Sequence, residues 1–502
     1  MNQSSDDNRV PLGWAMTKLG NVATINPRKP KYSDLGSEQL VGFVPMTAVD
    51  ADSGTVTKVE PTPLAEVRDK SYRTFATNDV LFAKITPCME NGKSAVVPAL
   101  PNDRGFGSTE FHVLRPFRGL DPMYLWQFVR QQSYRDEAEG HMTGSVGQLR
   151  VPLDFLRDTS FPLPPLPEQR RIVGRLRKID ARREATASHL DGARRIAERF
   201  RRAVLSAACS GRLTADWRED HPDSTSEELL TMLLEDRPLS TGRRTSAQNG
   251  HGLTSEAQLA LLPDTWSLVR LGDIIDVATG ATPLRKNRDY YEDGTIPWVT
   301  SGAVNAGTIT APTQMITPLA LAETNVKVFP PGTLLVAMYG EGQTRGRVAE
   351  LAIEAGTNQA VAAVLFNAET APLQPFIRAF FEDSYQRVRA LSIGGVQPNL
   401  NLGMIKATLI PLPPLEEQHE IVRRADAMVQ AADGWMARVD HTASALERTS
   451  RASLAKAFRG ELVPTEASLA EHDGHDFESA DELLARVGTT RPAKPAKREA
   501  RG

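Results

Sequence analysis

The sequence predicts an α+β protein built as an internal two-fold repeat, in which two mixed α+β domains are separated by two long helices forming an antiparallel coiled coil. Three observations carry this prediction. A proline-rich motif occurs twice, and each copy is followed by a long stretch with apolar residues at heptad spacing. The region before each copy is a series of short β-like runs broken by Gly and Pro.

The composition bounds the class of protein. At 502 residues the chain is long enough for several compact pieces, given roughly 100–200 residues per domain. Its 59 basic and 62 acidic residues leave a net charge of −3, so any positive surface for nucleic acid has to be local. Cys88 and Cys209 are too few and too far apart for a disulfide framework or a thiolate metal site. The polar N-terminal residues and the lack of a long apolar run predict a cytoplasmic location without membrane contact.

The motif Leu-Pro-Pro-Leu-x-Glu-Gln occupies residues 163–169 and again residues 412–418. The same offset relates Gly211 to Gly460 at the far end of the following stretch, so neither copy carries an insertion there. Tryptophans near the start of the two halves also correspond, but identities between these tryptophans and the motif are sparse. We therefore expect a rigid element shared by the copies and two globular halves that differ.

Each stretch after the motif is predicted to be one long helix. Pro167 and Glu168 suit a first turn, which needs no proline N–H and where the helix dipole favours a carboxylate. Gly211 and Gly460 are natural stops. The apolar positions follow interleaved heptad tracks, which are Ile172, Ile179, Ala193, Phe200 and Ala207 with Leu176, Leu190, Ala197 and Val204, and then Ile421, Met428 and Trp435 with Ala425, Ala432, Val439 and Leu446. The two seams can pair with each other as a coiled coil, or each helix can pack on its own domain; heptad spacing favours the coil.

The segment boundaries follow from these signals. The predicted segments are a first domain at 1–160, a first spacer helix at 161–215, a linker at 216–260, a second domain at 261–409, a second spacer helix at 410–465 and a polar C-terminal tail at 466–502. A weaker match relates residues 227–230 of the linker to residues 481–484 of the tail. Either the linker is a copy of the tail, or a short acidic-leucine pattern recurs by chance.

The sequence holds no motif typical of a catalytic, cofactor or metal site. Residues 91–94 resemble the end of a phosphate-binding loop, but Pro87 stands where that loop requires a glycine. His472 and His475 lie in a polar segment, where solvation is a simpler interpretation than metal binding. We expect no catalytic, cofactor-binding or metal-binding residues in this chain.

The order of a variable region, the proline-rich motif, a long helix and then the same again resembles the specificity subunit of Type I restriction–modification systems. The resemblance covers residues 11–465, and the paired motifs at 163–169 and 412–418 carry it. It implies a non-catalytic subunit in which each variable half is a target-recognition domain for one part of a bipartite double-stranded DNA site. The alternative is a duplicated scaffold, or an RNA- or protein-binding module, with the same architecture.

The resemblance also implies partners and their cofactors. It implies that the two helices set the gap between the half-sites and dock two modification (methyltransferase) subunits, and that restriction/translocase subunits join for cleavage. S-adenosylmethionine, ATP and Mg are expected on those partner subunits and no cofactor on this chain. Subunit-interface candidates lie where each helix begins, namely Glu168, Gln169, Arg171, Arg175, Glu417 and Gln418.

Side chains that read bases present two hydrogen-bonding groups at once and usually lie on loops. Two corresponding loops and two Gly-rich turns before the helices fit this requirement. The DNA-binding candidates of the first half are Lys84, Thr86, Asn91 and Lys93 on the loop, with Ser145, Gln148 and Arg150 on the turn. Those of the second half are Tyr339, Gln343, Arg345 and Arg347 on the loop, with Gln397 and Asn399 on the turn. Ordinary polar hairpin tips and tight turns that direct the chain into a helix would look the same.

Overall fold

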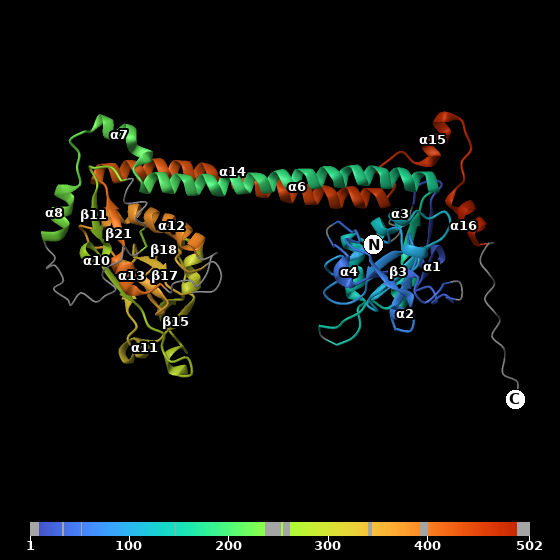
Figure 1. The fold of residues 1–502 in the computed structure, drawn as a ribbon, viewed down its shortest axis with the longest axis horizontal. Coiled ribbons are helices and arrows are strands. Elements are labelled where there is room, and N and C mark those ends of the chain that lie inside the picture. Colours follow the sequence, from blue (N-terminus) through green and yellow to red (C-terminus); the bar gives the residue numbers. More distant parts are fainter. Residues whose placement is uncertain are drawn as a thin grey trace, which may run out of the picture. The chain divides into compact units, whose positions relative to one another are not determined.

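The computed structural model describes residues 10–32, 35–51, 53–145, 147–235, 253–254, 262–339, 344–391 and 400–488 (Figure 1). The chain divides into two compact units. The first comprises Met1–Leu190 with His441–Gly502, and the second comprises Asp191–Asp440. Each unit therefore contains one globular half and a part of both long helices.

The globular half of the first unit is a mixed α+β domain with two four-stranded sheets, in the orders β2-β9-β6-β7 and β4-β3-β8-β5. The strands are β2 (Ala23–Ile25), β3 (Leu40–Val44), β4 (Glu60–Pro63), β5 (Arg73–Phe75), β6 (Val80–Ala83), β7 (Ser94–Val96), β8 (Gly105–Gly107) and β9 (Phe111–Pro116). The short helices are α1 (Leu19–Val22), α2 (Leu64–Val67), α3 (Pro122–Val129), α4 (Gln132–Gly140) and α5 (Leu153–Asp158). All four residues of β6 are buried, as a continuous apolar run between turn signals predicts.

The second globular half repeats this plan with a five-stranded sheet, β12-β20-β17-β18-β14, and a four-stranded sheet, β15-β13-β19-β16. The strands are β12 (Asp276–Thr279), β13 (Ile296–Val299), β14 (Thr308–Ile309), β15 (Gln314–Ile316), β16 (Val328–Phe329), β17 (Leu334–Ala337), β18 (Val348–Leu351), β19 (Ala355–Thr357) and β20 (Val361–Leu365). The helices are α10 (Leu271–Ile274), α11 (Pro318–Glu323), α12 (Gln374–Leu391) and α13 (Leu402–Ala407).

A two-stranded antiparallel sheet closes each globular half where its long helix begins. In the first unit β1 (Ala15–Lys18) pairs with β10 (Ser160–Leu163), and in the second β11 (Ser267–Arg270) pairs with β21 (Leu409–Leu412). The second strand of each pair ends on the first leucine of the repeated motif, Leu163 or Leu412. The motif therefore leads the chain out of this small sheet and directly into a long helix.

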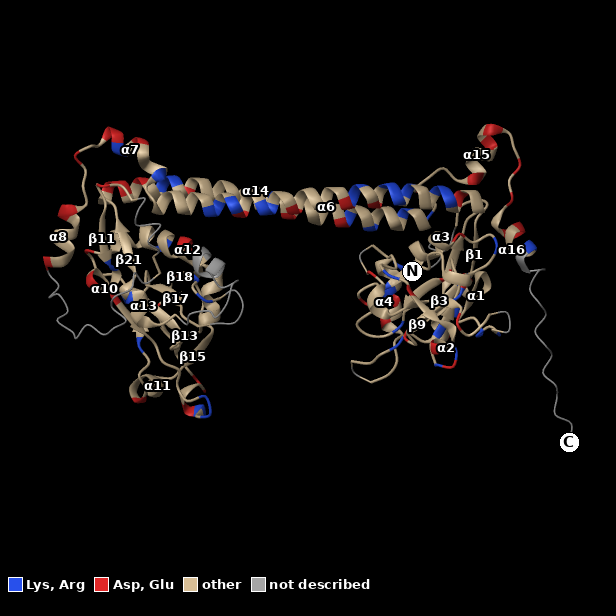
Figure 2. Ribbon diagram, in the orientation of Figure 1, with Lys and Arg blue, Asp and Glu red and all other residues tan. Residues whose placement is uncertain are grey.

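The predicted long helices are α6 (Leu166–Cys209) and α14 (Leu415–Phe458), each 44 residues long. They run antiparallel in both units. In the first unit Arg183 of α6 is paired with Glu447 of α14 at 3.1 Å. In the second unit Arg194 is paired with Asp440 at 2.7 Å. Figure 2 shows the basic residues distributed along α6.

The seam between the helices is mostly as predicted. Ile172, Leu176, Ala197 and Val204 of α6 are buried, as are Ile421, Ala425 and Ala432 of α14. The prediction is wrong for Met428, which is 39% exposed. Trp435 is 49% exposed, but its ring centre lies 6.0 Å from that of Phe200 on α6, as the seam prediction requires.

Short helices after α6 and α14 pack onto the globular halves in corresponding ways. The helix α8 (Glu227–Glu235) follows α7 (Ala215–Asp220) and buries Leu233 in the core of the second unit. The helix α16 (Ala480–Gly488) follows α15 (Glu466–Asp473) and buries Leu483 in the core of the first unit. The weak match between linker and tail is thus a structural repeat.

This packing corrects two predicted segments. The linker contains α7 and α8 and the polar tail contains α15 and α16, with Leu233 and Leu483 buried; the surrounding charged residues mask these helices in the sequence. Each globular half is consequently completed by the segment that follows the long helix of the other half. The segment after α6 completes the second unit, and the segment after α14 completes the first.

Candidate nucleic-acid interface

The first candidate loop follows the buried strand β6. Lys84 lies at its start, is only 15% exposed and is 3.9 Å from Glu110. Burial lowers the pKa of Lys84, while Glu110 raises it and the neighbouring Arg73 and Arg150 lower it further. Thr86, the next candidate, donates its hydroxyl hydrogen to Glu90 at 2.8 Å. Lys84 and Thr86 are thus held by the protein's own carboxylates.

The other two residues of this loop differ in exposure. Asn91 is exposed, and its backbone N–H closes a turn onto Pro87 at 3.0 Å. Lys93 is half-buried and donates from Nζ to the carbonyl oxygen of Met46 at 3.2 Å. Asn91 is therefore the loop candidate that presents its side chain to solvent.

The structure brings the Gly-rich turn of the first half against this loop. The N–H of Thr86 donates to the carbonyl oxygen of Leu149 at 3.1 Å, and Arg150 lies opposite Ile85 in a β-bridge. Arg150 forms a bidentate pair with Glu110, with both N···O distances 3.0 Å. Loop and turn thus form one surface, which cannot be predicted from residues about sixty positions apart in the chain.

Glu110 organises this surface. The hydrogen bonds from Arg150 and the charges of Lys84, Arg150 and Arg73 lower its pKa, although burial opposes them. The planar guanidinium of Arg150 has the geometry for a bidentate hydrogen bond to guanine, but here it binds the Glu110 carboxylate. Ser145 and Gln148 are exposed on the same turn. Of the first-half candidates, Asn91, Ser145 and Gln148 are therefore accessible, while Lys84 and Arg150 support them.

The second candidate loop follows β17. Tyr339 is 43% exposed. Arg345 and Arg347 lie on a turn closed by a hydrogen bond from the N–H of Gly346 to the carbonyl oxygen of Ala337 at 2.7 Å. Arg347 stacks on a helix of the same domain, with its guanidinium carbon 5.3 Å from the ring centre of Tyr385. Three candidates, Gln343, Gln397 and Asn399, lie outside the described residues.

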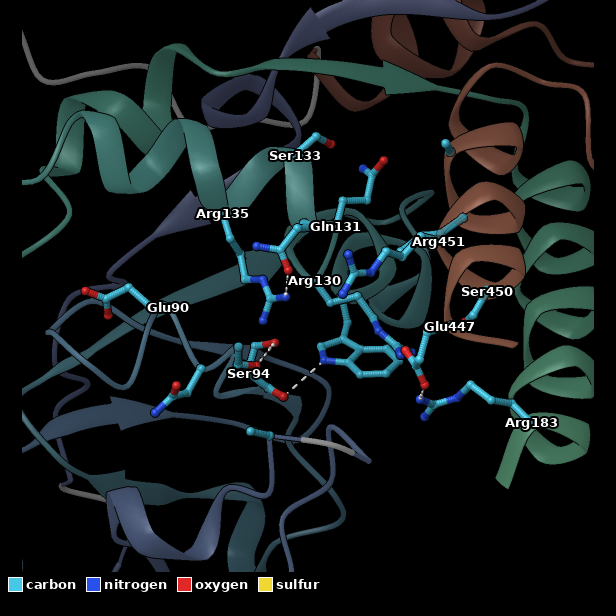
Figure 3. A pocket seen from close by; sticks show the side chains of 17 residues that line it. Glu90, Ser94, Arg130, Gln131, Ser133, Arg135, Arg183, Glu447, Ser450 and Arg451 are labelled. Carbon is cyan, nitrogen blue, oxygen red and sulfur yellow. Dashed lines mark hydrogen bonds and ion pairs between the residues drawn. The ribbon is translucent and has the colours of Figure 1, made fainter. Parts of the chain in front are cut away.

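A crevice of about 470 Å³ opens beside the first candidate loop (Figure 3). Glu90, Asn91 and Gly92 of the loop line one side. Most of the other lining side chains come from α3, α4 and the turn between them, and from α6 and α14. Those with a positive charge are Arg130, Arg135, Arg183 and Arg451. All of these residues belong to the first unit. Arg135 and Arg451 were not among the predicted site residues, because they lie far apart in the chain and neither belongs to a repeated motif.

Four subunit-interface candidates are buried within this chain. Glu168, Gln169, Glu417 and Gln418 are at most 1% exposed and bind their own chain. Glu417, for example, accepts hydrogen bonds from Thr214 at 2.7 Å and is ion-paired with Arg218. A carboxylate in a first helical turn has the same sequence pattern whether it binds a partner or the same chain.

The two remaining interface candidates differ. Arg171 is 31% exposed and is ion-paired with Glu466 at 2.5 Å, so it joins α6 to the segment after α14. Arg175 is exposed on α6 and remains a candidate.

Across the described ranges there is no cluster of three or more His, Cys, Asp or Glu that could hold a metal ion. Within those ranges, no helix combines the length and apolarity needed to cross a membrane.

The fold defines a class of protein: a duplicated α+β chain in which two different loop surfaces are attached to shared antiparallel helices. A family model described as "Type I restriction modification DNA specificity domain" matches residues 11–190 and 263–433. The chain belongs to this family. Its function is therefore DNA sequence specificity, and the alternative of an RNA or protein scaffold is not favoured.

Individual relatives agree with the family model. The EcoAI specificity subunit of Escherichia coli is 26% identical, over 84% of this chain and 79% of its own. The EcoKI specificity subunit of Escherichia coli K12 is 24% identical over 98% of both chains.

Two solved structures share the fold. A chain from a structure described as the basis of assembly and conformational transition of the type I R-M system has a TM-score of 0.67 and 22% identity. The match covers 90% of this chain and 100% of that one. The HsdS subunit from Thermoanaerobacter tengcongensis has a TM-score of 0.50 and 23% identity, over 91% and 99%.

Proposed function

We propose that this chain is the non-catalytic specificity subunit of a Type I restriction–modification complex, in which each globular half reads one part of a bipartite DNA site. One observation carries the proposal. In both units a tryptophan indole binds the buried glutamate in the first turn of the long helix, whereas the candidate loops differ in sequence and surroundings. Asn91 lies beside an arginine-lined crevice, whereas the second loop contains Tyr339 and Arg347, and Arg347 stacks on the ring of Tyr385. Two different readers on one repeated support suit a site with two different halves.

The base-reading side chains of the first half are proposed to be Asn91, Ser145 and Gln148. All three are exposed and present hydrogen-bonding groups. In the second half the proposed residues are Tyr339 and Arg345, together with Gln343, Gln397 and Asn399 on their sequence pattern alone. Lys84, Thr86, Lys93, Arg150 and Arg347 are proposed to hold these surfaces in shape.

The modification subunits are proposed to dock on the helices, two per chain, followed by restriction subunits. The region of α6 and α14 in the second unit supports a docking surface. Ile196, Met428 and Trp435 are 65%, 39% and 49% exposed there, although all three are large and apolar. Exposed apolar side chains that gather on a helix surface typically mark a protein interface. Arg175 is the charged candidate on the same helix in the first unit.

The chemistry of the complex is assigned to those partners. We propose that S-adenosylmethionine, ATP and Mg bind to the modification and restriction subunits and that this chain supplies recognition only. The proposed location is the cytoplasm, where the DNA that such a complex acts on lies.

Methylation mapping of a host that carries the complete system tests this proposal. With the chain present, we expect methylation at a single bipartite motif, and with its gene deleted we expect that motif to be unmethylated. A motif that stays methylated after the deletion would contradict the proposal.

A further inference from the structure

The crevice beside the first loop carries positive charge that its neighbouring carboxylates do not offset. Two of its four arginines are neutralised, because Arg130 is paired with Asp180 at 3.1 Å and Arg183 with Glu447 at 3.1 Å. Arg135 on α4 and Arg451 on α14 line the same crevice. Within the described part of the chain, neither has a carboxylate within ion-pair distance.

Arg135 is held in a position that is unfavourable for a cation. Its guanidinium lies against the loop so closely that a Cβ on Gly92 would be 1.9 Å from its Nη1. Its Nε is buried without a hydrogen-bond partner. Burial lowers the pKa of Arg135, and the charges of Arg130 and Arg451 lower it further, although Asp136 opposes them. A partly desolvated guanidinium that faces like charges is stabilised by an anion.

We propose that this crevice binds one phosphodiester group of the DNA duplex, between Arg135 and Arg451, and thereby positions the first loop on the bases. The inference rests on the proposed reading role of the first half. Phosphate contacts fix the orientation of a protein on DNA, while loop side chains supply specificity. Asn91 lines the crevice next to Gly92, so a phosphate there places its own nucleotide within reach of the loop.

Glu90 is the unpaired carboxylate of the crevice and would repel a phosphate nearby. Thr86 donates a hydrogen bond to its Oε1. In Figure 3 the Glu90 carboxylate points away from the arginines, at the opposite side of the crevice from Arg451. The position between Arg135 and Arg451 therefore stays attractive to an anion.

The internal repeat provides a matched control. Arg202 occupies on α6 the position that Arg451 occupies on α14, when the two helices are aligned through their shared motif and terminal glycine. In the first half a Ser-Tyr pair precedes Arg135. The same pair recurs in the second half at residues 384–385, but a glutamine follows it in place of the arginine. The pair of arginines therefore belongs to the first unit alone. Arg202→Gln removes the same charge from an equivalent helix position without touching the crevice.

The test measures binding of the purified full chain to duplex DNA over a series of salt concentrations. The logarithm of the affinity falls with the logarithm of the salt concentration, with a slope of about −0.9 for each phosphate contact. Because both arginines contact the same phosphate, we expect Arg135→Gln and Arg451→Gln each to reduce the magnitude of that slope by up to about 0.9, which is up to about eightfold in affinity at 0.1 M salt. Arg202→Gln is expected to leave the slope unchanged.

Each outcome bears on the inference. Unchanged slopes for both crevice variants, or an equal loss for Arg202→Gln, would overturn it while leaving the DNA-binding function intact. Failure of the unmodified chain and of its complex to bind DNA would overturn the proposed function itself. Ser133→Glu adds a negative charge to the crevice at an exposed position in the first turn of α4, where a carboxylate favours the helix. It is expected to weaken DNA binding with an unchanged unfolding midpoint, and unchanged binding would count against the inference.

Discussion

Trp14 donates its indole hydrogen to the buried carboxylate of Glu168 across 2.9 Å. The same bond recurs in the second unit, where Trp266 donates to Glu417 at 2.8 Å. Each bond ties the start of a globular half to the first turn of the long helix that leaves it. The loop surfaces are therefore fixed to the helices by side chains that both copies share.

Trp14→Phe removes the indole donor and is expected to destabilise the first unit more than Trp266→Phe destabilises the second. Glu168 would keep only the backbone N–H of Glu466, whereas Glu417 would keep Thr214 and Arg218. A buried carboxylate that loses a donor costs about 1–3 kcal/mol. Urea unfolding measures both variants. Because both lose the same indole volume and one hydrogen bond, the difference reports how far the remaining donors satisfy each carboxylate. Equal losses would contradict the prediction.

The glycine that ends α14 is expected to tolerate no side chain. Gly460 has φ of 75°, and a Cβ there would lie 2.3 Å from Cγ of Pro11. Gly460→Ala should lower the free energy of unfolding by about 1–2 kcal/mol from backbone strain alone. Gly174→Ala is the control, because Gly174 lies inside α6 with nothing within 4 Å of a Cβ. It should raise the stability by about 0.5–1 kcal/mol, as alanine does in a helix interior. The prediction fails if Gly460→Ala is neutral.

The first unit is expected to lose stability in acid through His112. This ring is buried, lies 3.0 Å from the amide of Asn26 and 2.9 Å from the carbonyl oxygen of Val151, and burial lowers its pKa to about 4. In the unfolded chain the His112 ring takes up a proton near pH 6.5, whereas in the folded chain it does so only near pH 4. The free energy of unfolding is therefore highest above pH 6.5 and falls as the pH drops from 6.5 to about 4, by at most about 3 kcal/mol. Unfolding midpoints of the unmodified chain and of His112→Gln, taken between pH 4.5 and 7.5, check this. The variant should show the smaller pH dependence, and parallel curves would argue against it.

Asn91→Ala is expected to relax the base preference of the complex at a single position of one half-site. Asn91 is exposed on the loop, and a lost bidentate contact to a base costs about 1–3 kcal/mol of discrimination. Methylation mapping with the assembled system reads this directly. Relaxation confined to one half-site is predicted; an unchanged motif would remove Asn91 from the reading surface.

The sequence predicted the repeat, the mixed domains and the paired helices, because local or periodic residue patterns determine each of them. Heptad spacing located buried residues such as Ile172 and Ala425, and glycines marked both helix ends. The burial of Glu168 and Glu417 did not follow, because their partners lie more than a hundred residues away. The crevice was missed for the same reason, since Arg135 and Arg451 are brought together only by packing of α14 against the first domain.

The central claim is that two different readers share a rigid helical support whose length sets the gap in the DNA site. Seven residues inserted after Leu190 in α6 and after Asp440 in α14 would fall on the boundary of the two units and preserve the contacts within each. One heptad adds about 10 Å of helix, or about three base pairs at 3.4 Å each. An insertion into only one helix would put the seams out of register and should abolish activity. Methylation mapping of the double insertion should show both half-sites unchanged and the gap longer by about three base pairs; an unchanged gap, or altered half-sites, would contradict the account.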